Sequence, residues 1–265
     1  MGLPSLDPFS SSARHKIWRA DELGLADAQV IGTGHVALDA QLPGGGWPVG
    51  AMTELLQATP EAHAWQLLLP ALAQAVQGGS GPVVLIGAPH EPFGPSLAAG
   101  GLPVESLLWV RSEAPAARLW ACEQALRCAD VAAVLAWLPQ ARVGELRRLQ
   151  LAAAQHESLL FVFRPIAAAA STSPARLRLQ LMACEDDSAQ IDVRILKRRG
   201  PPLASPIQLP ARSRRMTALL AASQLRRKLL RQQEGGPQEA QGATVVRLDF
   251  HQRNRHALDR IAVAA

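Results

Sequence analysis

The stretch Glu61–Gly87, EAHAWQLLLPALAQAVQGGSGPVVLIG, decides the fold class. Its first part repeats apolar residues at intervals of three and four, which predicts a helix over Glu61–Gln77 with one apolar stripe. Residues 78–82 end this helix, and Val83–Gly87 follows as a continuous apolar run. Such a run is typical of a strand that is buried on both faces of a parallel sheet. The stripe consists of Trp65, Leu68, Leu69, Leu72 and Val76.

The same alternation of strand and helix continues on both sides of this stretch. We expect an α/β fold with a mostly parallel sheet flanked by helices, because helices of ten to fifteen residues separate the apolar runs. The predicted strands are Ala51–Leu56, Leu107–Val110, Val131–Leu138 and Leu159–Phe163, with helices at Leu119–Cys128 and Val143–His156. Leu107–Val110 is expected to be as buried as Val83–Gly87. Ala175–Cys184 and Gln190–Arg198 predict an antiparallel hairpin that extends the sheet edge.

Four segments follow from these patterns. Residues 1–16 are predicted to be a flexible arm, and residues 17–210 the α/β domain. Residues 211–231 form a predicted basic helix whose leucines do not share one stripe, so it cannot bury all of them against one core. Residues 232–265 are polar and expected to be mostly disordered until bound.

Composition narrows the class of protein. The chain has 265 residues, of which 48% are hydrophobic, which suffices for a sizeable core. Its three cysteines form no Cys-X-X-Cys pair, which fits a reducing compartment. No segment resembles a signal peptide or a membrane span, so we expect a cytoplasmic location without membrane contact. Tyrosine is absent and aromatic residues make up 4%, so stacking platforms for single-stranded nucleic acid are scarce.

Positive charge is concentrated near the C-terminus. Eleven Lys or Arg residues and no Asp or Glu occur between Arg194 and Arg231. Such clusters suit either an acidic protein surface or the phosphate backbone of DNA without sequence specificity, and we place protein docking slightly ahead. The candidate residues are Lys197, Arg198, Arg199, Arg212, Arg214, Arg215, Arg226, Arg227, Lys228 and Arg231.

The segment Ile31–Leu55, IGTGHVALDAQLPGGGWPVGAMTEL, resembles the segment that leads into the first strand of RecA-type recombinases. The glycine-rich turn is interpreted as a tight turn that feeds a strand, with Trp47 capping the core, and less favourably as a binding loop. Asp39 is expected to fix the preceding turn through backbone N–H groups. The motif residues are Thr33, Gly34, Leu38, Asp39, Gly44, Gly45, Gly46, Trp47, Pro48, Gly50 and Glu54.

The next segment lacks the residues that bind nucleotide phosphates. A phosphate loop needs glycines, a lysine and a Ser or Thr that binds magnesium, and Gln57–Gln66 has neither Gly nor Lys and no hydroxyl at the required place. Pro89 stands where recombinases carry a catalytic glutamate, and Val131–Leu138 ends without a carboxylate. We therefore expect a degenerate phosphate-loop fold with no catalytic residues, no cofactor and no metal, rather than an enzyme.

From Trp18 to Arg212 the chain resembles a narrower family, the bacterial ImuA proteins. The similar stretches are Trp18-Arg19, LPGGGWPVGAMTELL, ARLWACEQALRC and LKRRGPPLASPIQLPAR. This resemblance implies a non-catalytic accessory role in translesion DNA synthesis and mutagenesis under the SOS response to DNA damage. The implied partners are an ImuB-like Y-family protein and an error-prone replicative-type polymerase, with RecA as a further candidate.

Two alternatives remain beside that interpretation. Residues 51–168 resemble SulA, the cell-division inhibitor that binds FtsZ, through the helix after TELL, GLPVESLLWV, a strand ending in Trp-Leu, and FVFRP. SulA-like chains lack the long basic C-terminal region, which favours ImuA. The other alternative is a RecA-like ATPase that binds DNA, and it predicts saturable binding of ATP at micromolar levels.

Overall fold

The computed structural model describes residues 29–59, 64–79, 81–184, 190–210 and 214–234. By its internal contacts the chain divides into two units, with the border after Arg214. The first unit contains the sheet, and helix α7 (Arg214–Glu234) belongs to the second apart from its first residue. The predicted arm, residues 235–265 of the predicted tail and Arg212 lie outside the described residues, whereas residues 232–234 belong to α7.

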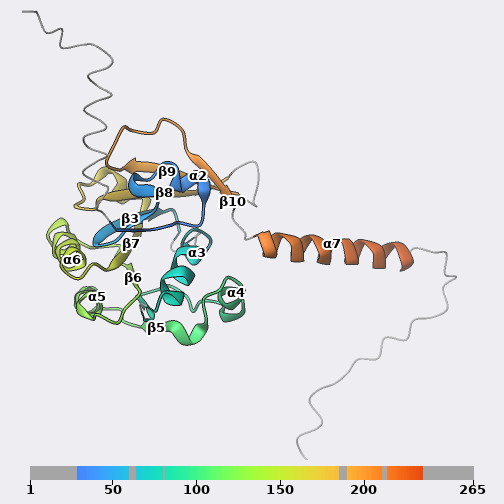
Figure 1. The fold of residues 1–265 in the computed structure, drawn as a ribbon, viewed down its shortest axis with the longest axis horizontal. Helices are drawn as coiled ribbons and strands as arrows, with labels where there is room; N and C mark the ends of the chain where they lie inside the picture. Colours follow the sequence, from blue (N-terminus) through green and yellow to red (C-terminus); the bar gives the residue numbers. More distant parts are fainter. Residues whose placement is uncertain (1–28, 60–63, 80, 185–189, 211–213, 235–265) are drawn as a thin grey trace, which may run out of the picture. The chain divides into compact units, whose positions relative to one another are not determined.

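An eight-stranded sheet forms the framework of the first unit (Figure 1). Its strand order is β10-β9-β8-β3-β7-β6-β4-β5. Of these eight strands β3 comes first along the chain, yet it lies inside the sheet. The bounds are β3 Ala51–Gln57, β4 Val83–Ile86, β5 Leu107–Val110, β6 Ala133–Trp137, β7 Leu159–Pro165, β8 Leu177–Ala183, β9 Gln190–Lys197 and β10 Ile207–Pro210. A separate antiparallel pair joins β1 (Val30–Ile31) to β2 (Trp47–Pro48).

The sheet is parallel from β8 to β5, while β9 pairs antiparallel with β8 and β10 pairs antiparallel with β9. This confirms the α/β class and the C-terminal hairpin, whose first strand β8 pairs directly with β3. The expected burial of Leu107–Val110 is wrong. Strand β5 is an edge strand, so no strand pairs with it on one side, and Leu108 is 52% exposed.

Helices cover both faces of the sheet. Figure 1 shows α5 and α6 on one side of the strands and α3 and α4 on the other. The apolar core divides accordingly, because alternate residues of a strand point to opposite faces. Leu55 packs with the α3 side, whereas Met52 packs with the α6 side. The bounds are α2 Val36–Asp39, α3 Ala64–Gln77, α4 Gly94–Ala99, α5 Pro115–Arg127 and α6 Val143–Gln155.

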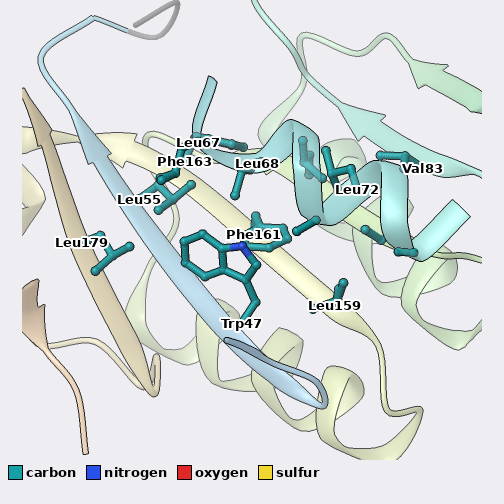
Figure 2. Packing of buried hydrophobic residues seen from close by; sticks show 14 of the residues in the cluster. Trp47, Leu55, Leu67, Leu68, Leu72, Val83, Leu159, Phe161, Phe163 and Leu179 are labelled. Atoms are coloured by element: carbon teal, nitrogen blue, oxygen red, sulfur yellow. The ribbon is translucent and has the colours of Figure 1, made fainter. Parts of the chain in front are cut away.

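Trp47 lies inside the core rather than at its margin. Its side chain is fully buried, and its ring meets Phe161 edge-on with centroids 5.3 Å apart (Figure 2). Leu55, Leu68 and Leu159 surround the pair. The expectation that Trp47 caps the core therefore understates its role, since the indole joins β2 to the α3 face of the sheet.

The segment before β3 is held by a hydrogen bond to Asp39 and by the close approach of Gly34 to α3. The backbone N–H of Thr33 donates to Asp39 Oδ1 at 2.8 Å, so Asp39 fixes the preceding turn as expected. Gly34 has φ +79°, and a Cβ there would lie 2.4 Å from the Cβ of Pro70 in α3. A glycine is therefore required at this position by both backbone conformation and space.

Glu54 forms a buried ion triad with two arginines. Its side chain is fully buried in β3, and its Oε1 lies 2.7 Å from Nη1 of Arg164 in β7. Its Oε2 accepts a hydrogen bond from Nε of Arg178 in β8. Arg178 also donates to the carbonyl oxygens of Ala168 and Ser171 at 2.8 and 3.1 Å. The triad thus joins three neighbouring strands through side chains as well as through backbone pairing.

Candidate protein-binding site

A groove runs between α5 and α6 at the carboxyl end of the parallel strands. It has a volume of about 870 Å³. One wall is the exposed side of α5, the other is the first half of α6, and the floor includes Trp137 at the end of β6. We call it the helix groove. Its lining residues are Glu113, Pro115, Ala116, Arg118, Leu119, Trp120, Glu123, Trp137, Leu138, Pro139, Gln140, Ala141, Arg142, Glu145, Arg148 and Leu149.

Ion pairs hold the two helices of the helix groove together. Glu123 in α5 lies 2.6 Å from Arg148 in α6 and also 2.6 Å from Arg127, one turn further along its own helix. At the start of α6, the backbone N–H of Arg142 donates to Glu145 Oε2 at 2.7 Å. The Glu123–Arg148 pair links the two walls, whereas the other two contacts each lie at one helix, and an exposed ion pair contributes little to stability.

Arg118 closes the inner end of the helix groove. Its Nε donates to the carbonyl oxygen of Ser112 at 2.5 Å. A Cβ at Gly87, directly after β4, would lie 2.7 Å from that nitrogen. The guanidinium therefore covers the carboxyl end of β4 closely, at the edge where ligands bind in many α/β folds. Arg118 belongs to no motif of the sequence that indicates such a position.

Two tryptophans differ sharply in exposure along the helix groove. Trp137 is buried and stacks on Phe163, with ring centroids 4.2 Å apart and planes 15° from parallel. Trp120, on the outward side of α5, is 65% exposed. A large exposed aromatic side chain beside a concave surface is typical of a protein-binding site, because tryptophan is enriched among residues that dominate binding energy.

Arginine and glutamate side chains supply the charged groups of the helix groove. Its lining contains no Ser, Thr, Cys or His, so it offers no hydroxyl, thiol or imidazole for nucleophilic catalysis. Its charged residues are three arginines and three glutamates. Across the described residues, no group of three His, Cys, Asp or Glu side chains is placed to hold a metal ion.

A second cavity lies at the opposite, amino end of the parallel strands. It has a volume of about 380 Å³ and lies where β2 precedes β3, beside the start of β8 and the end of β9. We call it the basic pocket. Its lining residues are Val30, Pro43, Gly46, Pro48, Val49, Pro174, Ala175, Arg176, Leu177, Lys197, Arg198 and Arg199.

The basic pocket brings together two groups of residues that lie about 150 positions apart in the sequence. Gly46 and Pro48 come from the glycine-rich turn, and Lys197, Arg198 and Arg199 come from the first basic cluster. Gly46 fits there because a Cβ would lie 2.4 Å from the carbonyl oxygen of Ile31. The glycine-rich turn therefore has both a structural role and a place in the wall of a cavity.

The second basic cluster lies in α7. Arg226, Arg227 and Lys228 are exposed on this helix. Arg214, Arg215 and Arg231 also belong to α7, but their side chains, like Arg212, lie outside the described residues. Leu225 and Leu229 are 59% and 50% exposed on the same helix. No helix in the described part of the chain is long and apolar enough to cross a membrane.

Sequence reasoning did not identify Arg164 and Arg178 as partners of Glu54, or Trp120 as an exposed surface residue. A carboxylate inside the apolar strand Ala51–Gln57 signals a buried partner, but the partner comes from strands over 100 residues away. For Trp120, a helix with no clear apolar stripe gives no indication of which side faces solvent.

Comparison with known proteins points to one family for the middle of the chain. The family model described as "Cell division inhibitor SulA" matches residues 50–159. A curated relative, the cell division inhibitor SulA of Edwardsiella piscicida, is 35% identical over 99 residues. That alignment covers 37% of this chain and 59% of the relative. The whole helix groove lies within residues 50–159, whereas all the lining residues of the basic pocket lie outside them. In its middle, the chain is thus similar to proteins described as inhibitors of cell division.

Proposed function

We propose that this chain is a non-catalytic protein that inhibits cell division by binding a protein of the FtsZ type through the helix groove. The observation that carries the proposal is the position of the groove. The segment that matches the SulA family contains α5, α6 and the exposed Trp120. Inhibition by binding needs no reacting group, and the groove lining contains no Ser, Thr, Cys or His.

Trp120 is the expected anchor for the partner. A tryptophan that is exposed in the free protein and buried in a complex dominates many interfaces, and its truncation costs about 2 kcal/mol or more. The flanking arginines and glutamates of the helix groove then supply a polar rim. The similarity of the matched segment to the SulA family also links the proposal to the SOS response to DNA damage.

The test compares two exposed apolar side chains on neighbouring helices. Trp120 lines the helix groove and is 65% exposed, whereas Leu151 in α6 is 64% exposed but does not line it. Overproduction of the natural protein is expected to make bacteria filamentous, and the purified protein to suppress FtsZ polymerisation in a sedimentation assay. Trp120→Ala is expected to weaken both effects at least ten-fold, and Leu151→Ala by less than two-fold.

Two results would contradict the proposal. Normal division under overproduction, together with unchanged FtsZ polymerisation, would remove the FtsZ-type partner. Equal loss of inhibition in Trp120→Ala and Leu151→Ala would show that the partner does not bind at the helix groove. Because both side chains are exposed, neither change is expected to unfold the protein, and circular dichroism checks this directly.

A second candidate is the ImuA-like accessory role in translesion synthesis. The observation that favours it is the extent of the chain beyond the match, which includes β8, β9, β10 and the basic helix α7. A pull-down with an ImuB-like protein tests it by comparing the full chain with a chain that ends at Ser213. Retention of the partner by the full chain alone supports docking through α7, and equal retention by both rejects it.

A further inference from the structure

We infer that the basic pocket is a binding site for an acidic peptide segment of a protein partner, one that carries at least one apolar side chain. This site is separate from the helix groove and does not depend on the FtsZ-type function proposed above. It would give the protein two partner surfaces at opposite ends of one sheet.

Charge is the first argument for an acidic ligand. Four cationic side chains line the basic pocket, from Arg176 before β8 and from Lys197, Arg198 and Arg199 at the end of β9. None of the lining residues is Asp or Glu. The positive charges of Arg176, Lys197 and Arg198 around one small cavity repel each other, and an anionic ligand relieves that repulsion.

Two of these cations are held in place by backbone carbonyls. Lys197 Nζ donates to the carbonyl oxygen of Ser173 at 3.0 Å. Arg198 Nε donates to the carbonyl oxygen of Pro201 at 2.9 Å, and its Nη1 donates to that of Gln41. Side chains that are already ordered lose less conformational entropy when a ligand binds. The rim of the basic pocket is therefore preorganised.

The walls indicate that the ligand also carries apolar atoms. Val30, Pro43, Pro48 and Val49 line one side, and Leu177 lines the other. A volume of about 380 Å³ lies within the range of roughly 300–1,000 Å³ that is usual for ligand pockets. This space accommodates an apolar side chain with neighbouring carboxylates at the rim.

Nucleic acid fits this cavity less well than a peptide does. None of the lining residues is aromatic, so the pocket lacks the aromatic rings on which bases usually stack. A phosphate backbone also needs cations spread along its path, whereas these four surround one concave spot. The shape and the apolar walls therefore favour a peptide.

The experiment uses the full chain and three labelled probes. The first is a synthetic peptide of alternating Glu and Leu, the second replaces each Leu with Ser, and the third is a single-stranded DNA oligonucleotide. Fluorescence anisotropy measures binding to the natural protein and to the double variant Arg176→Ala, Arg199→Ala. The control variant Arg226→Ala, Arg227→Ala removes the same charge from exposed positions of α7.

We expect the Glu-Leu peptide to bind the natural protein with a dissociation constant that rises at least ten-fold in the pocket variant. The control variant should change it by less than two-fold, and the Glu-Ser peptide should bind more weakly than the Glu-Leu peptide. Equal weakening by both variants, or equal binding of both peptides, would overturn the proposal. So would DNA binding that is lost in the pocket variant while the Glu-Leu peptide does not bind. FtsZ inhibition by the pocket variant is expected to stay intact, so failure here is distinct from failure of the proposed function.

Discussion

The two ends of the sheet differ in charge and in how the chain builds them. The helix groove at the carboxyl end has three arginines and three glutamates and comes from one continuous stretch of sequence. The basic pocket at the amino end has four cations without an acid, and segments before β3 and after β7 form it. The SulA-like match contains every lining residue of the helix groove and none of the lining residues of the basic pocket. The similarity to a known family therefore bears on the helix groove, whereas the role of the basic pocket follows from its charge and shape alone.

The largest expected effect concerns the triad that connects the matched segment to the rest. Glu54→Gln would leave Arg164 and Arg178 without their buried counter-charge, and breaking such a pair typically costs about 3–5 kcal/mol. We expect the free energy of unfolding to fall by that amount in urea denaturation. Glu123→Gln, which removes the partner of two exposed arginines, is expected to cost about 1 kcal/mol or less. Similar losses in both variants would show that the triad does not couple the two regions.

The next effect separates close packing from backbone strain before β3. Gly34 and Gly45 have φ values of +79° and +78°, but a Cβ at Gly45 meets nothing within 4 Å. Gly45→Ala is expected to cost about 1–2 kcal/mol from the left-handed backbone alone. Gly34→Ala adds a clash with Pro70, so we expect about 2–4 kcal/mol. Thermal denaturation of both variants measures the difference, and equal melting temperatures would mean that Pro70 moves aside without cost.

A smaller effect reports on the core beneath the helix groove. Burial, with a lesser contribution from Glu123, raises the pKa of the Cys122 thiol to about 12. Cys128, at the end of α5, is exposed. At pH 8, iodoacetamide should therefore modify Cys128 in the native protein at least about 100-fold faster than Cys122, since the thiolate is the reactive form. Mass spectrometry of the alkylated chain measures this ratio, and comparable rates would show that α5 opens readily.

The smallest effect lies in the segment before β3 and depends on pH. Burial lowers the pKa of His35, while nearby backbone groups of Gln66 and Leu67 and the carboxylate of Asp39 oppose the shift. The unfolded chain therefore binds a proton more readily than the folded one, and stability falls as the pH drops below about 6.5. We expect His35→Gln to flatten the difference in unfolding free energy between pH 7.5 and pH 5. If the difference in unfolding free energy between the two pH values is unchanged in His35→Gln, groups other than His35 cause the pH dependence.

The order of the elements was predictable because periodicity is local. The apolar run Val83–Gly87 indicates a strand by itself, and the stripe of Glu61–Gln77 indicates a helix. The sheet contains a strand at each of the predicted apolar runs. Which strand lies at the edge was not predictable, because Leu107–Val110 is as apolar as its buried neighbours. Exposure there depends on the absence of a further strand, which no local pattern records.

The cavities were harder to predict than the elements. The basic cluster at Lys197–Arg199 was visible in the sequence, but its meeting with Gly46 and Pro48 depends on long-range strand pairing. The helix groove depends on the side chains of α5, a helix with no clear apolar stripe. The sequence shows that positive charge is concentrated at Lys197–Arg199. That these side chains share a cavity with Pro43 and Pro48 follows only from the strand order.

The place of β3 in the sheet has a consequence for synthesis and for fragments. Its neighbours β7 and β8 leave the ribosome roughly 100 residues later, so β3 stays unpaired while the intervening chain is made, and such distant pairing slows folding. A fragment cut at residues 50 and 159 would retain Glu54 without Arg164 or Arg178. The segment that resembles a known family is therefore not a separable module, and experiments on its activity require the strands that follow it.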